Sequence, residues 1–376
     1  MIAVPALTKV KFRVRQSVGF PPKSIFPREF PPLNATHPEL DLGPIDVHVH
    51  LSLSGESGSD GWSRRRWVMR PFLAAAAREI GLRGGFAGRD FDARYLARLV
   101  GWLDDSSLSA AVLLAYDWVR DSTGCPRRDL SDLYVPNEAV LALARRHSKF
   151  LPGVSIHPAR PDAFEELERC AEQGAALLKL LPCVQNIDCN ENRYKPFWER
   201  LAALDLPLLA HTGGEFCVRS IRHDLKSPAC LRLPLECGVT VIAAHCGTRA
   251  LPWDGDHFQT FLEMRDLYPN LYGDLSPLSH ITHLASLERL REDPARLLHG
   301  TDYPVVSAVF PSLLKGWISR AELHRLNAIG NPLEKKIQLT RAQGFPESVF
   351  TDLWRLLPDR VVQSFQHRQV SQMENA

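Results

Sequence analysis

The residues best suited to carry out chemistry are histidines and one aspartate at the ends of short apolar runs. His48 and His50 lie two apart in a β-branched run, and side chains two apart on a strand point to the same face. His211, His245 and Asp302 each stand at the end of a later apolar run. Imidazole nitrogens and carboxylate oxygens are ligands for zinc and other transition metals. The pattern therefore predicts a divalent metal site, provided that the fold gathers these residues.

Eight apolar runs could position these residues, and they alternate with segments of helical character. We expect strands at residues 44–50, 109–116, 151–157, 176–182, 206–211, 239–245, 270–275 and 295–302. Mostly unbroken apolar runs are typical of parallel strands that are buried on both faces. Eight such strands alternating with helices predict a distorted (β/α)8 TIM barrel, in which the chemistry occurs at the carboxyl ends of the strands.

The barrel is expected to span residues 44–362, with an N-terminal arm at 1–43 and a polar tail at 363–376. A long insertion, residues 51–107, follows the first strand and should lie over the barrel mouth. Helices are expected at 65–80 and 90–103 within this insertion, and at 313–325, 331–343 and 346–357 in a helical C-terminal part.

The composition is that of an ordinary globular protein, with 45% hydrophobic and 23% charged residues and a net charge of +2. The sequence has no basic and aromatic nucleic-acid motif, and no apolar run reaches the roughly 18 residues of a membrane span. Neither nucleic acid nor a membrane is therefore an expected partner. The eight cysteines form no Cys-x-x-Cys pair and no secretory signal is evident, so we expect reduced thiols and a cytoplasmic protein.

Four motifs, in this order, resemble those of the amidohydrolase superfamily. They are Asp-Val-His-Val-His at 46–50, Leu-Ala-His-Thr-Gly at 209–213, Ala-Ala-His-Cys-Gly at 243–247 and Gly-Thr-Asp-Tyr-Pro at 300–304. Within the superfamily, the chain is similar to the branch of short metal-dependent amidohydrolases related to aminocarboxymuconate-semialdehyde decarboxylase. The resemblance covers roughly residues 44–340. Larger members add a small β-sandwich from both termini, and we expect that domain to be absent here.

By this resemblance, His48, His50, His211 and Asp302 would hold a divalent metal. Three imidazoles and one carboxylate leave an open position for water, whose pKa the metal lowers to about 7. Asp302 would also accept a proton from that water, while His245 would act as general acid or base or polarise the substrate oxygen. Zinc is the expected ion, with Mn, Fe, Ni and Co as alternatives, and one ion per chain is favoured.

Lys179, in the fourth expected strand, leaves three interpretations open. In binuclear members of the superfamily, a lysine at this strand carries a carbamate that bridges two metals. His245 would then bind the second metal together with His211. Lys179 could instead provide a cation for a substrate carboxylate or support the barrel mouth. An inward lysine must be paired or shift its pKa, so each interpretation gives the residue a role.

Tyr116, Glu215 and Arg219 are candidate substrate contacts, because Tyr116 ends the second strand and the other two follow His211 on one loop. Loops after barrel strands select substrates, and arginine binds a carboxylate through paired hydrogen bonds. The expected partner is therefore a small molecule, with carboxylates as one candidate class. A homo-oligomer is compatible with the sequence.

The leading interpretation is a metal-dependent hydrolase that uses metal-activated water on an amide, ester or lactone carbonyl. A non-oxidative decarboxylase of unsaturated or aromatic carboxylic acids would use the same site and is the first alternative. A barrel without catalytic activity, acting as a binding protein, is the second. Fold analogy cannot supply the substrate itself.

Overall fold

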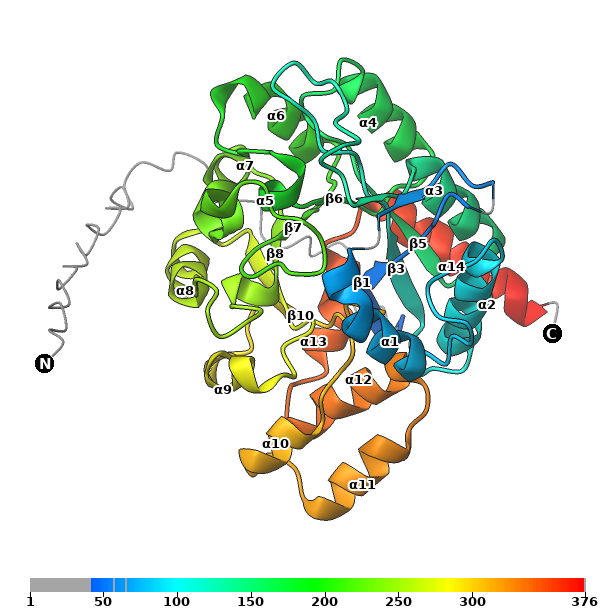
Figure 1. Ribbon diagram of the computed structural model, residues 1–376. Helices are drawn as coiled ribbons and strands as arrows, with labels where there is room; N and C mark the ends of the chain where they lie inside the picture. The colour runs from blue at the N-terminus through cyan, green and yellow to red at the C-terminus, as the bar shows by residue number, and fades with distance from the viewer. Residues whose placement is uncertain (1–41, 57, 65, 375–376) are drawn as a thin grey trace, which may run out of the picture. The chain divides into compact units, whose positions relative to one another are not determined.

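The structure is a computed structural model that describes residues 42–374, except residues 57 and 65. The arm expected at residues 1–43 lies almost entirely outside the described residues. Eight parallel strands form one sheet in the order β1-β3-β5-β6-β7-β8-β9-β10, with helices outside it (Figure 1). Their bounds are β1 Ile45–His50, β3 Ala110–Leu114, β5 Phe150–Val154, β6 Leu177–Leu180, β7 Leu208–His211, β8 Val241–Ala244, β9 Leu271–Asp274 and β10 Leu297–Leu298.

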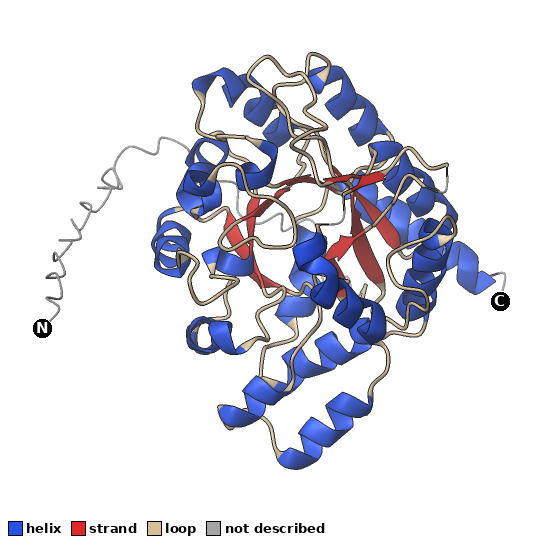
Figure 2. Ribbon diagram, viewed as in Figure 1, coloured by secondary structure: helices blue, strands red, loops and turns tan. Residues whose placement is uncertain are grey.

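Backbone hydrogen bonds between β1 and the segment after β10 close the sheet into a barrel (Figure 2). The N–H of Val47 donates to the carbonyl of His299 at 3.0 Å, and the N–H of Asp302 donates to the carbonyl of His48 at 2.8 Å. The eighth strand expected at 295–302 is thus shortened to two residues, with an irregular continuation that still pairs with β1. The (β/α)8 barrel predicted from the sequence is confirmed.

Helices surround the barrel and extend its C-terminal part. They are α1 Arg70–Glu79, α2 Phe91–Asp104, α3 Asn137–Arg146, α4 Ala163–Glu172, α5 Pro182–Gln185, α6 Lys195–Ala203, α7 Arg232–Glu236, α8 Phe258–Leu267, α9 Leu284–Glu292, α10 Phe310–Leu314, α11 Arg320–Ala328, α12 Pro332–Ala342, α13 Ser348–Thr351 and α14 Asp359–Glu374. Helices α1 and α2 belong to the insertion after β1, as expected. A short antiparallel pair, β2 Trp62–Ser63 with β4 Leu133–Tyr134, joins the insertion to the loop after β3.

The barrel interior is filled by side chains from every strand. They include Ile45, Val112, Leu151, Leu177, Leu209, Ile242, Tyr272 and Leu298. Trp354 and Phe365 belong to the same buried cluster. The indole N–H of Trp354 donates to the carbonyl of Gly43, directly before β1, at 2.9 Å. The C-terminal segment therefore packs at the amino ends of the strands, which leaves the carboxyl ends for a site.

A register shift in β1 aims its histidines at the barrel mouth. Asp46 pairs with Ala111 and Val49 pairs with Leu113, so β1 has one more residue than β3 between these pairs. Such a bulge changes which side chains face inward. Ile45 and Val47 consequently stay in the interior cluster, while His48 and His50 turn toward the mouth.

Two helices expected in the C-terminal part are broken in the structure. The segment 313–325 is not continuous, because Gly316 adopts φ 69° and Ser319 begins α11 with a capping box. The segment 346–357 forms the short helix α13 and a 3-10 turn at Asp352–Arg355. The sequence contained the signals for the first break, since glycine and a Ser-x-x-Glu pattern both mark helix ends.

The segment expected as a polar tail, residues 363–376, is helical as far as Glu374, where α14 ends. Val361 and Phe365, four apart on this helix, are 3% and 1% exposed and pack against the barrel interior. Val362 belongs to the same cluster and is fully buried, so three apolar side chains anchor an otherwise polar helix.

All eight cysteines are free, as the scattered spacing predicts. Among the described residues, no helix combines the length and the apolarity needed to span a membrane.

The buried imidazole of His299 predicts a loss of stability at mildly acidic pH. Burial, with the nearby charges of Lys336 and Arg341, lowers the pKa of His299 to about 3. The unfolded chain takes up this proton below about pH 6.5, so this contribution to stability is lost as the pH falls from 6.5 toward 3. In urea titrations, we expect His299→Leu to reduce the loss between pH 7.5 and 5 by about 2 kcal/mol. The exposed His324→Leu variant is the control, and equal pH dependence in wild type and His299→Leu would contradict the prediction.

Candidate metal centre

Three donor atoms at the carboxyl end of the barrel lie close enough to share one metal ion. The Nε2 atoms of His48 and His50 are 3.2 Å apart, and Asp302 Oδ1 lies 3.3 Å and 3.0 Å from them. Donors about 2.1 Å from a tetrahedral ion are about 3.4 Å apart, so these spacings fit a common ligand set. The imidazoles of His48 and His50 outweigh the effect of burial and hold the pKa of Asp302 well below its usual range. The residues present therefore fit a divalent metal.

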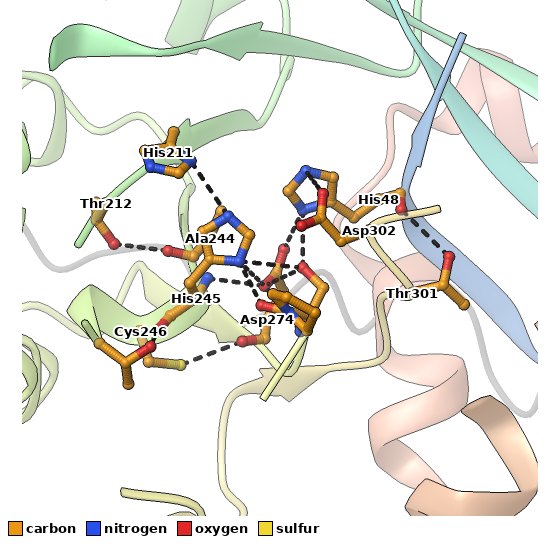
Figure 3. Close-up of polar contacts among 12 residues, drawn as sticks. His48, His211, Thr212, Ala244, His245, Cys246, Asp274, Thr301 and Asp302 are labelled. Carbon is orange, nitrogen blue, oxygen red and sulfur yellow. Dashed lines mark hydrogen bonds and ion pairs between the residues drawn. The ribbon is translucent and has the colours of Figure 1, made fainter. Parts of the chain in front are cut away.

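Asp274 fixes the orientation of His48, and the sequence analysis did not select it. Its Oδ2 accepts the proton of His48 Nδ1 at 2.7 Å, which leaves the lone pair of Nε2 facing the site (Figure 3). Burial would raise the pKa of Asp274, but the charge and hydrogen bond of His48 lower it to about 2. Its position at the end of β9 was the available signal, because the other candidate ligands also lie at strand ends.

Lys179 points into the barrel, as its strand position predicts. Its Nζ lies 2.9 Å from His48 Nε2 and therefore donates a hydrogen bond to that lone pair. Burial lowers the pKa of Lys179 to about 8, against the opposing charges of Asp274 and Asp302. A metal on His48 would displace this hydrogen bond. A neutral amine is also the form that reacts with carbon dioxide, so the carbamate interpretation stays open.

His245 and His211 form a second pair on the opposite side of the site (Figure 3). The Nδ1–H of His245 donates to the carbonyl of Ser276, so its Nε2 carries a lone pair. That atom lies 3.2 Å from His211 Nδ1, which must therefore hold a proton, and His211 Nε2 is left without one. Burial, helped by His245 and Lys179, lowers the pKa of His211 well below its usual value.

The structure separates His211 from the other expected metal ligands. Among the described residues, two groups have donor atoms all within 4.8 Å of one another. They are His48, His50 and Asp302, and His48, His245 and Asp274. His211 belongs to neither group. Its unprotonated Nε2 is buried and has no hydrogen-bond partner among the described residues, so it is still an available ligand atom.

The backbone at the site is held in unusual conformations. Asp302 and His245 have φ values of 59° and 62°, in the left-handed region that non-glycine residues rarely adopt. Asp46 supports the first of these segments, because its Oδ1 accepts the N–H of His48 at 2.9 Å and of Thr301 at 3.1 Å. Burial raises the pKa of Asp46 to about 7. This carboxyl group ties the two histidines of β1 to the segment that carries Asp302.

Tyr95, from the insertion, is expected to strengthen metal binding by holding His50 in place. Its buried hydroxyl donates to the carbonyl of His50 at 2.7 Å. We expect Tyr95→Phe to cost about 1 kcal/mol of stability and to weaken metal affinity severalfold, because one hydrogen bond is lost without a change of shape. Urea unfolding and competition with a metal indicator measure the two effects, with the exposed Phe310→Leu as control. Unchanged metal affinity in Tyr95→Phe would contradict a positioning role.

The three candidate substrate contacts occupy different environments. Glu215 is near the site, with Oε2 3.6 Å from His211 Nε2, and burial raises the pKa of its carboxyl group. Tyr116 is 4% exposed, and burial raises the pKa of its hydroxyl. Arg219 is exposed, and its backbone N–H donates to Asp132 Oδ2 at 2.8 Å. The structure therefore places Glu215 beside the histidines and leaves Arg219 exposed.

Comparison with known proteins gives a family and a set of distant structural relatives. The family model described as Amidohydrolase matches residues 45–310. A TIM-barrel protein from Bordetella bronchiseptica is 19% identical, with a TM-score of 0.49 over 80% of this chain and 99% of that one. A probable 2-pyrone-4,6-dicarboxylic acid hydrolase from Acinetobacter baumannii is 14% identical, with a TM-score of 0.49 over 86% and 98%.

A third solved structure, 5-carboxyvanillate decarboxylase from Sphingomonas paucimobilis, is 13% identical. Its TM-score is 0.43 over 86% of this chain and 99% of that one. No curated protein matches the sequence.

Proposed function

Because the chain belongs to the amidohydrolase family, we propose that it is a metal-dependent hydrolase of amide, ester or lactone bonds. The observation that carries this proposal is the triangle formed by His48 Nε2, His50 Nε2 and Asp302 Oδ1, with edges of 3.0–3.3 Å. Packing alone does not require two imidazoles and a carboxylate at this spacing. Family membership likewise favours an enzyme over a barrel that only binds ligands.

His48, His50 and Asp302 would hold the metal, with His211 Nε2 as a fourth ligand. A bound divalent ion would supply a Lewis acid for the carbonyl oxygen and would make water a nucleophile near neutral pH. We favour one ion per chain and zinc as its identity, since imidazole and carboxylate ligands suit it. A carbamate on Lys179 with a second ion on His211 and His245 is the alternative arrangement. The eight free cysteines support a cytoplasmic location.

The residues around the triangle have distinct tasks in this proposal. The Asp302 carboxylate lies at the proposed metal position, so it can accept a proton from the attacking water. The Nδ1–H of His245 is held by Ser276 and its Nε2 carries a lone pair, so His245 can take this proton from Asp302 and donate it to the leaving group. Lys179 can donate a hydrogen bond to a substrate oxygen when it is released from His48.

Product analysis in water enriched in ¹⁸O tests the proposed reaction. The metal-loaded protein would be incubated with a panel of amides, esters, lactones and unsaturated or aromatic carboxylic acids, and the products identified by mass spectrometry. We expect at least one acyl compound to give a carboxylic acid that contains one ¹⁸O, and we expect Asp302→Asn to abolish this product. Release of carbon dioxide without ¹⁸O in the organic product would contradict hydrolysis and support the decarboxylase alternative.

A further inference from the structure

We propose that Glu215 and Tyr116 form a subsite that binds a hydrogen-bond-donating group of the substrate, such as an ammonium or an amide N–H, next to the reacting carbonyl. This inference rests on the proposed hydrolase function and narrows its substrate class. It favours cationic or neutral acyl compounds over the carboxylates that the sequence suggested as one class.

One carboxylate oxygen of Glu215 accepts two backbone hydrogen bonds, and the other accepts none from the described residues. Its Oε1 accepts the backbone N–H groups of Cys217 at 2.6 Å and Val218 at 3.1 Å. The side chain is only 9% exposed, and Oε2 points toward His211 Nε2 at 3.6 Å. No described residue donates a hydrogen bond to Oε2. The two backbone bonds hold the carboxylate in place, so Oε2 is a preorganised acceptor beside the metal centre.

His211 Nε2 faces Glu215 as a second acceptor. The chain of hydrogen bonds from Ser276 through His245 places the proton of His211 on Nδ1, so Nε2 has only a lone pair. Two acceptors 3.6 Å apart without a hydrogen between them repel each other unless a donor or a cation satisfies them. In the proposed centre the metal occupies His211 Nε2, so the group that a substrate N–H donor would satisfy is Glu215 Oε2.

Tyr116, two residues after β3, supplies a further buried polar group. Its residue is 4% exposed, and its hydroxyl is buried without a hydrogen-bond partner among the described residues. The loop that carries Glu215 contacts Asp132 through the N–H of Arg219, and the neighbouring Val135 exchanges two backbone hydrogen bonds with Tyr116. A buried hydroxyl normally has a partner, so a ligand group in this subsite would complete its hydrogen bonding.

The arginines of the neighbouring loops do not oppose this negative subsite. Arg222 pairs with Asp224 at 2.6 Å, and Arg249 pairs with Asp256 at 2.9 Å. The remaining candidate, Arg219, is exposed. Lys226, on the same loop, pairs with Asp254 at 3.6 Å. The loop charge beside His211 is therefore the acidic Glu215, which suits a donor or cation better than a carboxylate.

The loop that carries Glu215 is also fixed from outside the barrel. Phe216 packs edge-to-face against Phe72 of α1, with ring centroids 4.5 Å apart. The N–H of Gly214 donates to the carbonyl of Thr248 at 2.8 Å. Contacts on both sides of Glu215 thus limit its movement, as a specificity residue requires.

Calorimetric titration with three amides of matched shape tests the proposal at pH 7, where an α-amino group is mostly protonated. Glycinamide carries an ammonium, propionamide a methyl group and malonamate a carboxylate at the corresponding position. We expect the metal-loaded wild type to bind glycinamide at least tenfold more tightly than the other two, because hydrogen bonds to charged groups are strong. Glu215→Gln should lose about ten- to hundredfold in glycinamide affinity. Glu199→Gln, an exposed change of the same kind on α6, is the control.

The outcomes separate this proposal from the proposed function. Equal or tighter binding of malonamate by the wild type, or no binding of any amide, would overturn the donor subsite. Loss of half or more of the bound metal in Glu215→Gln would make Glu215 a metal ligand and would also overturn it. These titrations measure affinity without turnover, so the ¹⁸O experiment can fail or succeed independently.

Discussion

Replacing His50 with Ala is expected to remove the divalent metal while leaving the barrel folded. His50 Nε2 is one of the three donors of the triangle, and its side chain is 21% exposed, so its loss leaves little buried space. The backbone groups of His50 keep their bonds, since its N–H donates to Tyr303 and its carbonyl accepts from Tyr95. We expect metal affinity to fall by about 100-fold or more, because even residues that only support a ligand cost 10–100-fold when removed.

Metal content after dialysis, together with urea unfolding, measures both parts of this prediction. The exposed His324→Ala variant is the control, since its metal content should match that of the wild type. If His50→Ala kept one tightly bound ion per chain, the triangle would not be the metal site.

Replacing Asp274 with Ala should have the largest effect on stability, about 3–5 kcal/mol. Asp274 is fully buried, and its Oδ2 pairs with His48 Nδ1 at 2.7 Å. Its Oδ1 accepts the N–H of His245 at 2.9 Å and the hydroxyl of Ser276 at 2.8 Å. The N–H of Ser276 also donates to Oδ1, at 3.2 Å. Removing the carboxylate therefore leaves four buried donors without an acceptor, which is costly in a low-dielectric interior. Chemical denaturation at pH 7.5 measures this effect.

Asp274→Asn separates the charge from the shape of the side chain. We expect it to fold, but to bind metal about 10–100-fold more weakly, because an amide is a poorer partner for His48 Nδ1–H. The exposed Asp129→Ala variant should change neither stability nor metal affinity appreciably. Wild-type stability in Asp274→Ala would show that the His48–Asp274 pair contributes nothing to the fold.

The sequence pattern was sufficient to predict the barrel and the end of the barrel at which the site lies. Period-two alternation placed His48 and His50 on one face, and strand order placed Lys179, His211, His245 and Asp302 around the same mouth. This worked because parallel strands in a barrel bring all their carboxyl ends together. The donor triangle of His48, His50 and Asp302 is within that prediction.

The role of Asp274 and the distance of His211 from the other proposed ligands could not be derived in the same way. The inward direction of Asp274 depends on how β9 pairs with β8 and β10, which a single sequence does not specify. Likewise, the register shift in β1 depends on its pairing with β3, and strand alternation alone cannot locate it. Glu215 was selected only as one of several loop charges, because its turn with Cys217 and Val218 is a local backbone conformation.

Metal content per chain on freshly purified protein, without added metal or chelator, tests the central claim most directly. The account predicts a value near one divalent ion per chain in the wild type and near zero in His50→Ala. A value near two that rises when bicarbonate is supplied with metal would favour a carbamate on Lys179 and a second ion. A value near zero in the wild type that added metal cannot raise would contradict the proposed metal-dependent hydrolase.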